Sequence, residues 1–285
     1  MDRAVERIDL DARLKDRLEW RRGATSKSQT ENVVDLWQVD LDCDSEDVAS
    51  HFELLSNTEK ERASRFAFAK DMNRFIVGRG MLRKILSEHL GVAPEKISLL
   101  AGRFGKPFLS ARDVGIRFNV SHSRGVAVIA VSLDREVGID IEFVDSSFDV
   151  FSVVHGVFSP QAISRLRSLP SNLLADTFFA GWTRKEAVLK AMGDGLSGAE
   201  ELQSAILSIN DKDLPSQMLA NLNNRNWSIT TFNIWEDLKA TLAVEGAIDA
   251  IRLWQLAESR NGVDPKHWLR PVTVNFTPFY PILYQ

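Results

Sequence analysis

The sequence is poor in cysteine and has no long apolar run, and both shortages exclude classes of protein. Cys43 is the single cysteine among 285 residues, so the chain cannot form an internal disulfide. The five histidines are scattered and give no zinc-site spacing with it (residues 51, 89, 122, 155 and 267). No stretch approaches the roughly 18 apolar residues of a membrane span, and the charged N-terminus MDRAVERIDLDARLKDRLEW lacks the apolar core of a signal peptide. We therefore expect a soluble, cytoplasmic protein with no membrane partner.

The chain also lacks an excess of positive charge. It has 35 Lys and Arg against 39 Asp and Glu, which gives a formal net charge of −4. A surface that binds nucleic acid throughout is therefore not indicated, although a local basic groove remains possible. With 44% hydrophobic residues, the chain can build one large domain or two modest ones.

The order of helical and strand-like patterns predicts an α+β fold made of two similar α/β halves. The halves are residues 31–134 and 135–256, and no close sequence repeat links them. Residues 1–30 predict an appended helix and a polar linker. Residues 257–285 predict an extended tail rich in proline and aromatic side chains.

Individual elements follow from alternation, helical spacing and turn residues. Helices are expected at residues 3–20, at 55–90 with a break near 66–71, at 159–169 and at 176–192, where Gly193 ends the last one. Strands are expected near residues 33–41, 97–101, 107–110, 116–123, 126–132, 136–143, 205–209, 227–234, 239–246 and 250–256.

The strand-like stretch VGIDIEFVD places two carboxylates on one face. A period of two directs Ile139 and Ile141 to one side and Asp140 and Glu142 to the other. Side chains two apart on a strand stand about 7 Å apart, so both acids could reach one cation. The pair could equally be the solvated acidic face of an amphipathic edge strand.

A third carboxylate, Glu186, occupies an apolar side of the helix predicted at 176–192. Helical geometry places it between Phe179 and Trp182. Either it forms a salt bridge with Lys190 one turn later, or a negative charge is needed at that position. Together with the strand pair, it would complete three oxygen ligands of the kind that suits Mg²⁺, which usually shares its shell with water and substrate phosphates.

Two short segments offer groups that could bind phosphate. Lys106 follows Gly105 in a turn that leads into a strand, and Ser121-His122-Ser123 ends the strand predicted at 116–123. A surface turn with ordinary cations and a structural histidine explain the same residues. The helices of residues 58–86 carry further cations, most of which we expect on a solvated face: Arg62, Arg65, Arg74, Arg79, Arg83 and Lys84.

Taken together, several motifs in a fixed order resemble the surfactin-type 4′-phosphopantetheinyl transferases over residues 31–256. They are RFAFAKD, GRGMLRKIL, GKPFL, FNVSHS, VGIDIE and a Trp-x-x-Lys-Glu-x(3)-Lys run that ends in GDGL. The resemblance implies a pseudo-twofold pair of α+β halves with the site in the cleft between them. It also implies Mg²⁺ in the site and transfer of the phosphopantetheine arm of coenzyme A to a serine of an acyl or peptidyl carrier protein.

The resemblance assigns roles to individual residues. The metal set would be Asp140, Glu142 and Glu186, of which Glu142 is the least constant among relatives; Glu186 and Lys190 would be catalytic. The groups that hold the phosphates of coenzyme A would be Arg62, Lys106, Ser121, His122 and Lys190. Relatives often have a basic residue where Glu59 stands and a small or basic one at Asp194, so nearby phosphate contacts are expected to differ.

Three other functions compete with carrier modification. A coenzyme A or nucleotide sensor would keep the pocket without transfer, a Mg²⁺-dependent phosphohydrolase would need no carrier, and a nucleic-acid binder would use the basic helices. The retained carboxylates with Lys190 argue against a sensor, and the net negative charge argues against a nucleic-acid partner. Because one chain contains both halves, we expect a monomer.

Overall fold

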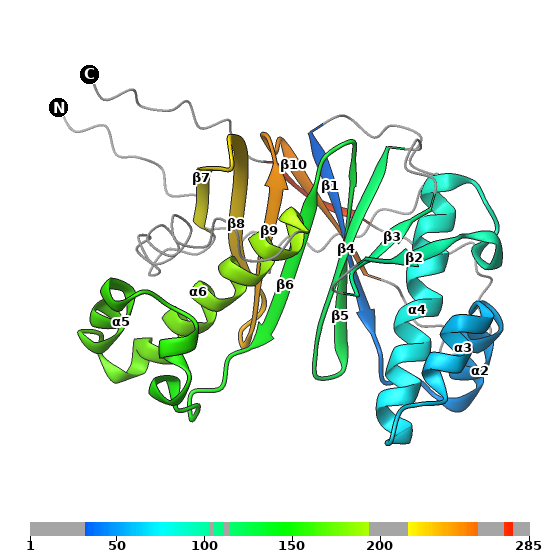
Figure 1. Ribbon diagram of the computed structural model, residues 1–285, viewed down its shortest axis with the longest axis horizontal. Helices are drawn as coiled ribbons and strands as arrows, with labels where there is room; N and C mark the ends of the chain where they lie inside the picture. Colours follow the sequence, from blue (N-terminus) through cyan, green and yellow to red (C-terminus); the bar gives the residue numbers. More distant parts are fainter. Residues whose placement is uncertain (1–31, 103–104, 111–114, 194–215, 256–270, 276–285) are drawn as a thin grey trace.

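The computed structural model describes residues 32–102, 105–110, 115–193, 216–255 and 271–275 and has the predicted mixed α+β architecture (Figure 1). The helix predicted at 3–20, the strand predicted at 205–209 and most of the predicted tail lie outside these residues. No helix of the described part is long and apolar enough to cross a membrane.

The first half contains a sheet with strand order β11-β10-β1-β5-β4. Its strands are β1 (Val33–Asp40), β4 (Ile116–Ser123), β5 (Val126–Leu133), β10 (Ala250–Gln255) and β11 (Pro271–Asn275). The pairing of β1 with β10 is parallel and the others are antiparallel. Because β10 comes from residues 250–255, this sheet includes a strand of the segment that the sequence placed in the second half.

Three helices flank this sheet on one side (Figure 1): α2 (Ser45–Glu53), α3 (Asn57–Ala63) and α4 (Ala69–Leu90). A short 3₁₀ helix η1 (Pro94–Lys96) and the two-stranded sheet of β2 (Leu99–Ala101) and β3 (Pro107–Leu109) follow. The predicted break between two helices is confirmed, and Ser56 begins α3 with a capping box in which Glu59 is the reciprocal partner. Helix α2 was not predicted.

The second half contains a sheet of order β6-β9-β8-β7, covered on its outer face by α6 (Figure 1). Its strands are β6 (Val137–Phe143), β7 (Ser216–Leu222), β8 (Arg225–Trp235) and β9 (Leu238–Glu245). Four helices of the described part lie between β6 and β7 in the chain: η3 (Val150–Ser152), η4 (Val154–Gly156), α5 (Pro160–Arg167) and α6 (Ser171–Met192). Gly193 ends α6 in the left-handed conformation, as predicted.

The two sheets share a core, and each has a second core under its helices. Side chains such as Val34 and Val128 of the first sheet pack against Ile139 and Ile141 of the second. The opposite face of the first sheet packs against α4, and that of the second packs against α6. Strand alternation therefore turns the isoleucines of β6 toward the first sheet and leaves its other face for α6.

Candidate active site

Gly138 determines how close α6 comes to β6. A Cβ atom at this position would lie 2.0 Å from the Ala187 carbonyl oxygen and 2.5 Å from the Ala191 nitrogen. The main chain of the helix thus contacts the strand where the strand has no side chain. Positions 140 and 142 follow on the same face of β6, so the contact brings α6 beside Asp140 and Glu142.

Lys190, in the last turn of α6, forms its ion pair with Asp140. Its Nζ lies 2.6 Å from Asp140 Oδ1 and also donates to the Ser121 hydroxyl at 2.9 Å and the Ile139 carbonyl at 3.3 Å. The salt bridge between Glu186 and Lys190, one of the two explanations left open by the sequence, is not among the ion pairs of the described residues. The lysine therefore joins the helix to the strand, and its charge acts on Glu186 without a direct ion pair.

Asp140 is the most buried of the three acids, with 4% of its surface exposed. Its Oδ1 accepts from Lys190 and from Ser121, whereas Oδ2 is buried and has no hydrogen-bond partner among the described residues. Burial raises the pKa of Asp140, while Lys190 acts in the opposite direction. An unpartnered buried carboxylate oxygen is costly unless something positive reaches it.

Glu142 and Glu186 are half-buried and interact electrostatically with Asp140. Burial is the main cause that raises the pKa of both glutamates. Charge repulsion adds to it, from Asp140 on each and from Glu186 on Glu142. No group of three His, Cys, Asp or Glu side chains in the described residues already stands at metal-ligand spacing. The orphan Asp140 oxygen and the mutual repulsion nevertheless fit a hard cation that keeps waters in its shell.

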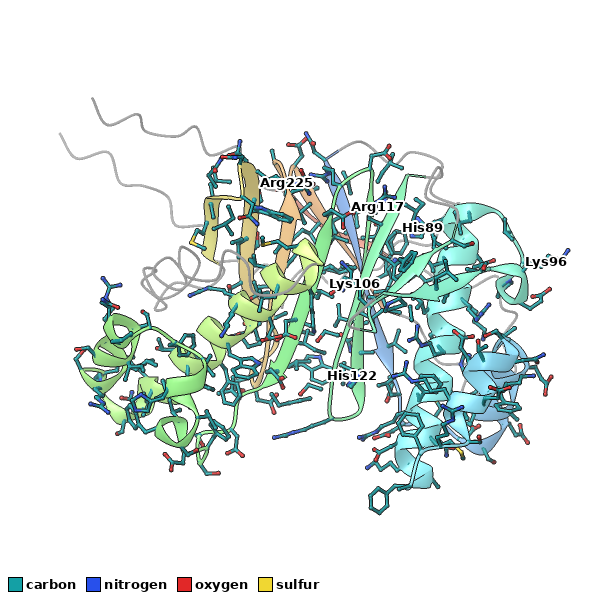
Figure 2. The ribbon with its side chains drawn as sticks, in the orientation of Figure 1. His89, Lys96, Lys106, Arg117, His122 and Arg225 are labelled. Atoms are coloured by element: carbon teal, nitrogen blue, oxygen red, sulfur yellow. The ribbon has the colours of Figure 1, made fainter. Side chains whose placement is uncertain are left out.

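Two of the groups predicted to hold phosphate, Lys106 and His122, interact with the residues of this site. Figure 2 shows Lys106 and His122 in the central region between α4 and α6. Lys106 Nζ donates to the Lys190 carbonyl at 2.5 Å, which joins the loop before β3 to the end of α6. Burial lowers the pKa of Lys106, and the charge of Lys190 contributes.

His122, near the end of β4, is partly exposed and partly covered, and its imidazole is held toward the neutral form. Loss of hydration lowers its pKa, and the charges of Lys190 and Arg74 act in the same direction. Arg74 reaches this neighbourhood from α4, where both its Nε and one Nη lie 2.7 Å from the carboxylate of Asp42. Local sequence patterns could not predict this pairing of Arg74, because Asp42 is 32 residues away.

Arg62 contacts a different surface. Its guanidinium lies 5.2 Å from the centre of the Phe75 ring, and that of Arg79 lies 5.6 Å from the same ring. Among the described residues Arg62 forms no ion pair or hydrogen bond with Asp140 or Lys190, so its phosphate role stays a prediction.

The prediction that the cations of residues 58–86 lie mostly on a solvated face is wrong for Arg83. This side chain is only 2% exposed, lies 2.7 Å from Glu59 and donates to the carbonyls of Pro94 and Ile97. Glu59, expected to alter phosphate contacts, is thus occupied in the cap of α3 and in this buried pair. The sequence pattern Ser-x-x-Glu at 56–59 was the available signal for this structural role.

Comparison with known proteins decides the family. Residues 42–134 match the family described as 4′-phosphopantetheinyl transferase, N-terminal, and residues 136–243 match the 4′-phosphopantetheinyl transferase superfamily. The chain is 40% identical over 175 residues to the 4′-phosphopantetheinyl transferase HetI of Nostoc sp. The aligned region is 61% of this chain and 74% of HetI. The chain belongs to the 4′-phosphopantetheinyl transferase superfamily. The family resemblance predicted from its motifs is therefore confirmed, and the protein is an enzyme of the transferase class.

More distant relatives have the same kind of name. The 4′-phosphopantetheinyl transferase gsp of Aneurinibacillus migulanus is 36% identical over 146 residues, which is 50% of this chain and 59% of gsp. The human L-aminoadipate-semialdehyde dehydrogenase-phosphopantetheinyl transferase is 34% identical over 151 residues, or 48% of each chain. The match thus spans roughly half the length of these two relatives.

Proposed function

We propose that this transferase moves the phosphopantetheine arm of coenzyme A onto a serine of an acyl or peptidyl carrier protein. The observation that supports the proposal most is the ion pair of Asp140 and Lys190. This pair lies beside Glu142 and Glu186, where α6 contacts β6. Carboxylates for a cation and an ammonium group for phosphate are the groups that phosphoryl transfer requires. The proposed site lies in a cleft between the two halves, and a single chain supplies both of them.

The proposed reaction breaks the diphosphate linkage of coenzyme A and forms a phosphate ester with the carrier serine. The carrier serine oxygen forms a bond to the phosphorus that bears the pantetheine arm, and the bond from that phosphorus to adenosine 3′,5′-bisphosphate breaks. We assign Glu186 as the acceptor of the serine proton, because it is a half-buried carboxylate of α6 beside Asp140 and one helical turn from Lys190. Lys190 faces the departing bisphosphate and stabilises its negative charge.

The remaining polar groups bind and orient the substrate in this proposal. Asp140, Glu142 and Glu186 would hold Mg²⁺, which when bound neutralises negative charge on the diphosphate. Lys106 and His122 would meet the phosphates from the first half, and Arg62 would extend the set from α3. His122, held toward its neutral form in the free protein, would gain a proton more readily beside a bound phosphate.

The test is a carrier-loading assay. The protein, coenzyme A, Mg²⁺ and an apo-carrier domain are incubated, and the carrier is weighed for one added phosphopantetheine. We expect loading by the wild type and a loss of about 100-fold or more in Glu186→Gln, in the range typical of a lost general base. Glu88→Gln, at an exposed position of α4, is the matched control and should keep full rate.

Three results would contradict the proposal. Release of free phosphopantetheine without a carrier would indicate a phosphohydrolase, and binding of coenzyme A with no product would indicate a sensor. Near-normal loading by folded Glu186→Gln would remove Glu186 from the reaction. In Lys190→Ala the rate of carrier loading should fall more than the affinity for the carrier, because Lys190 is assigned to stabilise the departing bisphosphate.

A further inference from the structure

Strands β4 and β6 are edge strands of different sheets, and side chains of β4 bridge them. Three side chains at alternate positions of β4 accept hydrogen bonds from main-chain N–H groups at alternate positions of β6. Asn119 Oδ1 accepts from Ile139 at 2.9 Å, Ser121 Oγ from Ile141 at 3.2 Å, and Ser123 Oγ from Phe143 at 3.4 Å. The row satisfies N–H groups that the exposed edge of β6 would otherwise leave without partners.

The two serines do more than the asparagine, because a hydroxyl can donate while it accepts. Ser121 gives its proton to Asp140 Oδ1 at 3.0 Å, and Ser123 gives its proton to Glu142 Oε2 at 2.9 Å. Each serine therefore holds a main-chain N–H of β6 and the carboxylate of the preceding residue. Among the described residues Asn119, at the start of the row, has no such bond to a carboxylate, because the residue before Ile139 is Gly138.

The bonds of Ser121 use its full hydrogen-bonding capacity. Its one proton goes to Asp140, and its oxygen accepts from Ile141 N–H and from Lys190 Nζ. A hydroxyl has one proton and two lone pairs, so nothing is left to donate to a phosphate. The family resemblance makes Ser121 a phosphate ligand, but these bonds favour a role toward Asp140.

We propose that Ser121 and Ser123 are positioning residues that fix Asp140 and Glu142 across the seam between the two sheets, and that Ser123 makes Glu142 a competent metal ligand. This rests on the proposed function insofar as the carboxylates hold Mg²⁺. The orphan Asp140 Oδ2 supports it, because the serine and lysine fix one oxygen and leave the other for a cation. Partners of this kind orient ligands and commonly change metal affinity or activity by roughly 10–100-fold.

Ser123→Ala is the decisive variant, because Ser123 is half-buried and contacts Glu142 without contacting Lys190. Two calorimetric titrations that involve no turnover are measured: coenzyme A into protein with EDTA, and Mg²⁺ into protein saturated with coenzyme A. We expect about a ten-fold loss of Mg²⁺ affinity and an unchanged dissociation constant for coenzyme A. Ser123→Thr, which keeps the hydroxyl, should restore the Mg²⁺ affinity.

Asn119→Ala provides the matched control, because it removes a bridge that has no carboxylate. It should lower the melting temperature while Mg²⁺ affinity stays within about two-fold, which separates positioning from loss of structure. Ser121→Ala should likewise weaken Mg²⁺ binding and spare coenzyme A binding in EDTA. Weakened coenzyme A binding in EDTA would instead restore the role of phosphate ligand to Ser121.

The inference can fail independently of the proposed function. Unchanged Mg²⁺ affinity in folded Ser123→Ala would overturn it even if the wild type loads carriers normally. Absence of Mg²⁺ binding by the wild-type complex with coenzyme A would overturn it as well. Conversely, if the wild type binds both ligands but loads no carrier, the proposed function fails while the two titrations still decide the role of the serines.

Discussion

Helices α4 and α6 have the same length and the same type of ending but meet their sheets in different ways. Each has 22 residues and a following glycine in the left-handed conformation. Helix α4 rests on large side chains, among them Met81, Leu82 and Ile85, in a core with aromatic residues of the first sheet. Helix α6 instead brings its main chain onto Gly138 of β6.

The difference explains why the carboxylates and Lys190 gather in the second half. A layer of large apolar side chains separates a helix from the polar groups of a strand by a full packing distance of about 10 Å. Direct contact at a glycine lets Lys190 reach Asp140 at 2.6 Å. The first half contributes loop and strand-end groups, such as Lys106 and Ser121, at the same place.

Gly138→Ala should break this arrangement and have the largest effect. The new Cβ would overlap main-chain atoms of Ala187 and Ala191, which cannot rotate away, so α6 must shift. We expect a loss of about 3 kcal/mol in unfolding free energy, at the upper end for overpacking, and about a 100-fold lower rate of carrier loading. Urea unfolding and the mass assay measure the two effects.

Gly78→Ala in α4 is the control for the same substitution. Its Cβ would meet only Leu41 Cδ2, at an ordinary 3.5 Å. Because alanine favours a helix more than glycine does, we expect a gain of roughly 0.5–1 kcal/mol and a normal loading rate. Equal effects of the two substitutions would show that α6 is not held by its contact with β6.

Protonation of His51 at acid pH should give the next largest effect, a loss of stability in the first half. Its ring packs against Gly80 of α4, and its Nδ1 has no partner among the described residues. Burial, with a contribution from Lys84, lowers the pKa of His51 from 6.5 to about 4. Between these values the unfolded chain binds a proton that the native chain does not, so stability is present above pH 6.5 and is lost as pH falls toward 4.

The expected loss from His51 is about 2 kcal/mol between pH 8 and pH 5. Urea unfolding of the wild type and His51→Gln at both pH values measures it as the difference between their pH dependences. The control is His155→Gln, because His155 is exposed in η4 of the second half. If His51→Gln loses as much stability at pH 5 as the wild type does, the buried histidine is not the cause.

Much of this arrangement was predictable, because local patterns determine it. Alternation placed Asp140 and Glu142 on the face of β6 opposite Ile139 and Ile141, and the structure confirms this. The sequence also singled out Glu186 as a carboxylate that needed an explanation. Periodicity could not show that Lys190 pairs with Asp140, because that depends on how closely α6 approaches β6.

The contacts and elements that sequence reasoning missed depend on features that it did not read. The serines of β4 reach residues of β6 about 20 positions later because two sheet edges meet, which strand periodicity alone cannot indicate. Arg184 is fully buried on α6, where it donates to Thr231, although an arginine in a helix suggests a solvated position. Helix α2 was missed even though Asp44 caps its first turn.

The smallest predicted effects test the feature that the two helices share. Gly91 and Gly193 follow α4 and α6 with φ of +64° and +77°, and a Cβ at either position would meet no atom of the described residues within 4 Å. Alanine there should therefore lose only the backbone preference, about 1 kcal/mol in each case, and asparagine should lose less because it tolerates this conformation. Urea unfolding of the alanine and asparagine variants at both positions measures these losses. If Gly193→Ala costs several times more than Gly91→Ala, contacts beyond backbone conformation hold the end of α6, and the two helices differ at their ends as well as at Gly138.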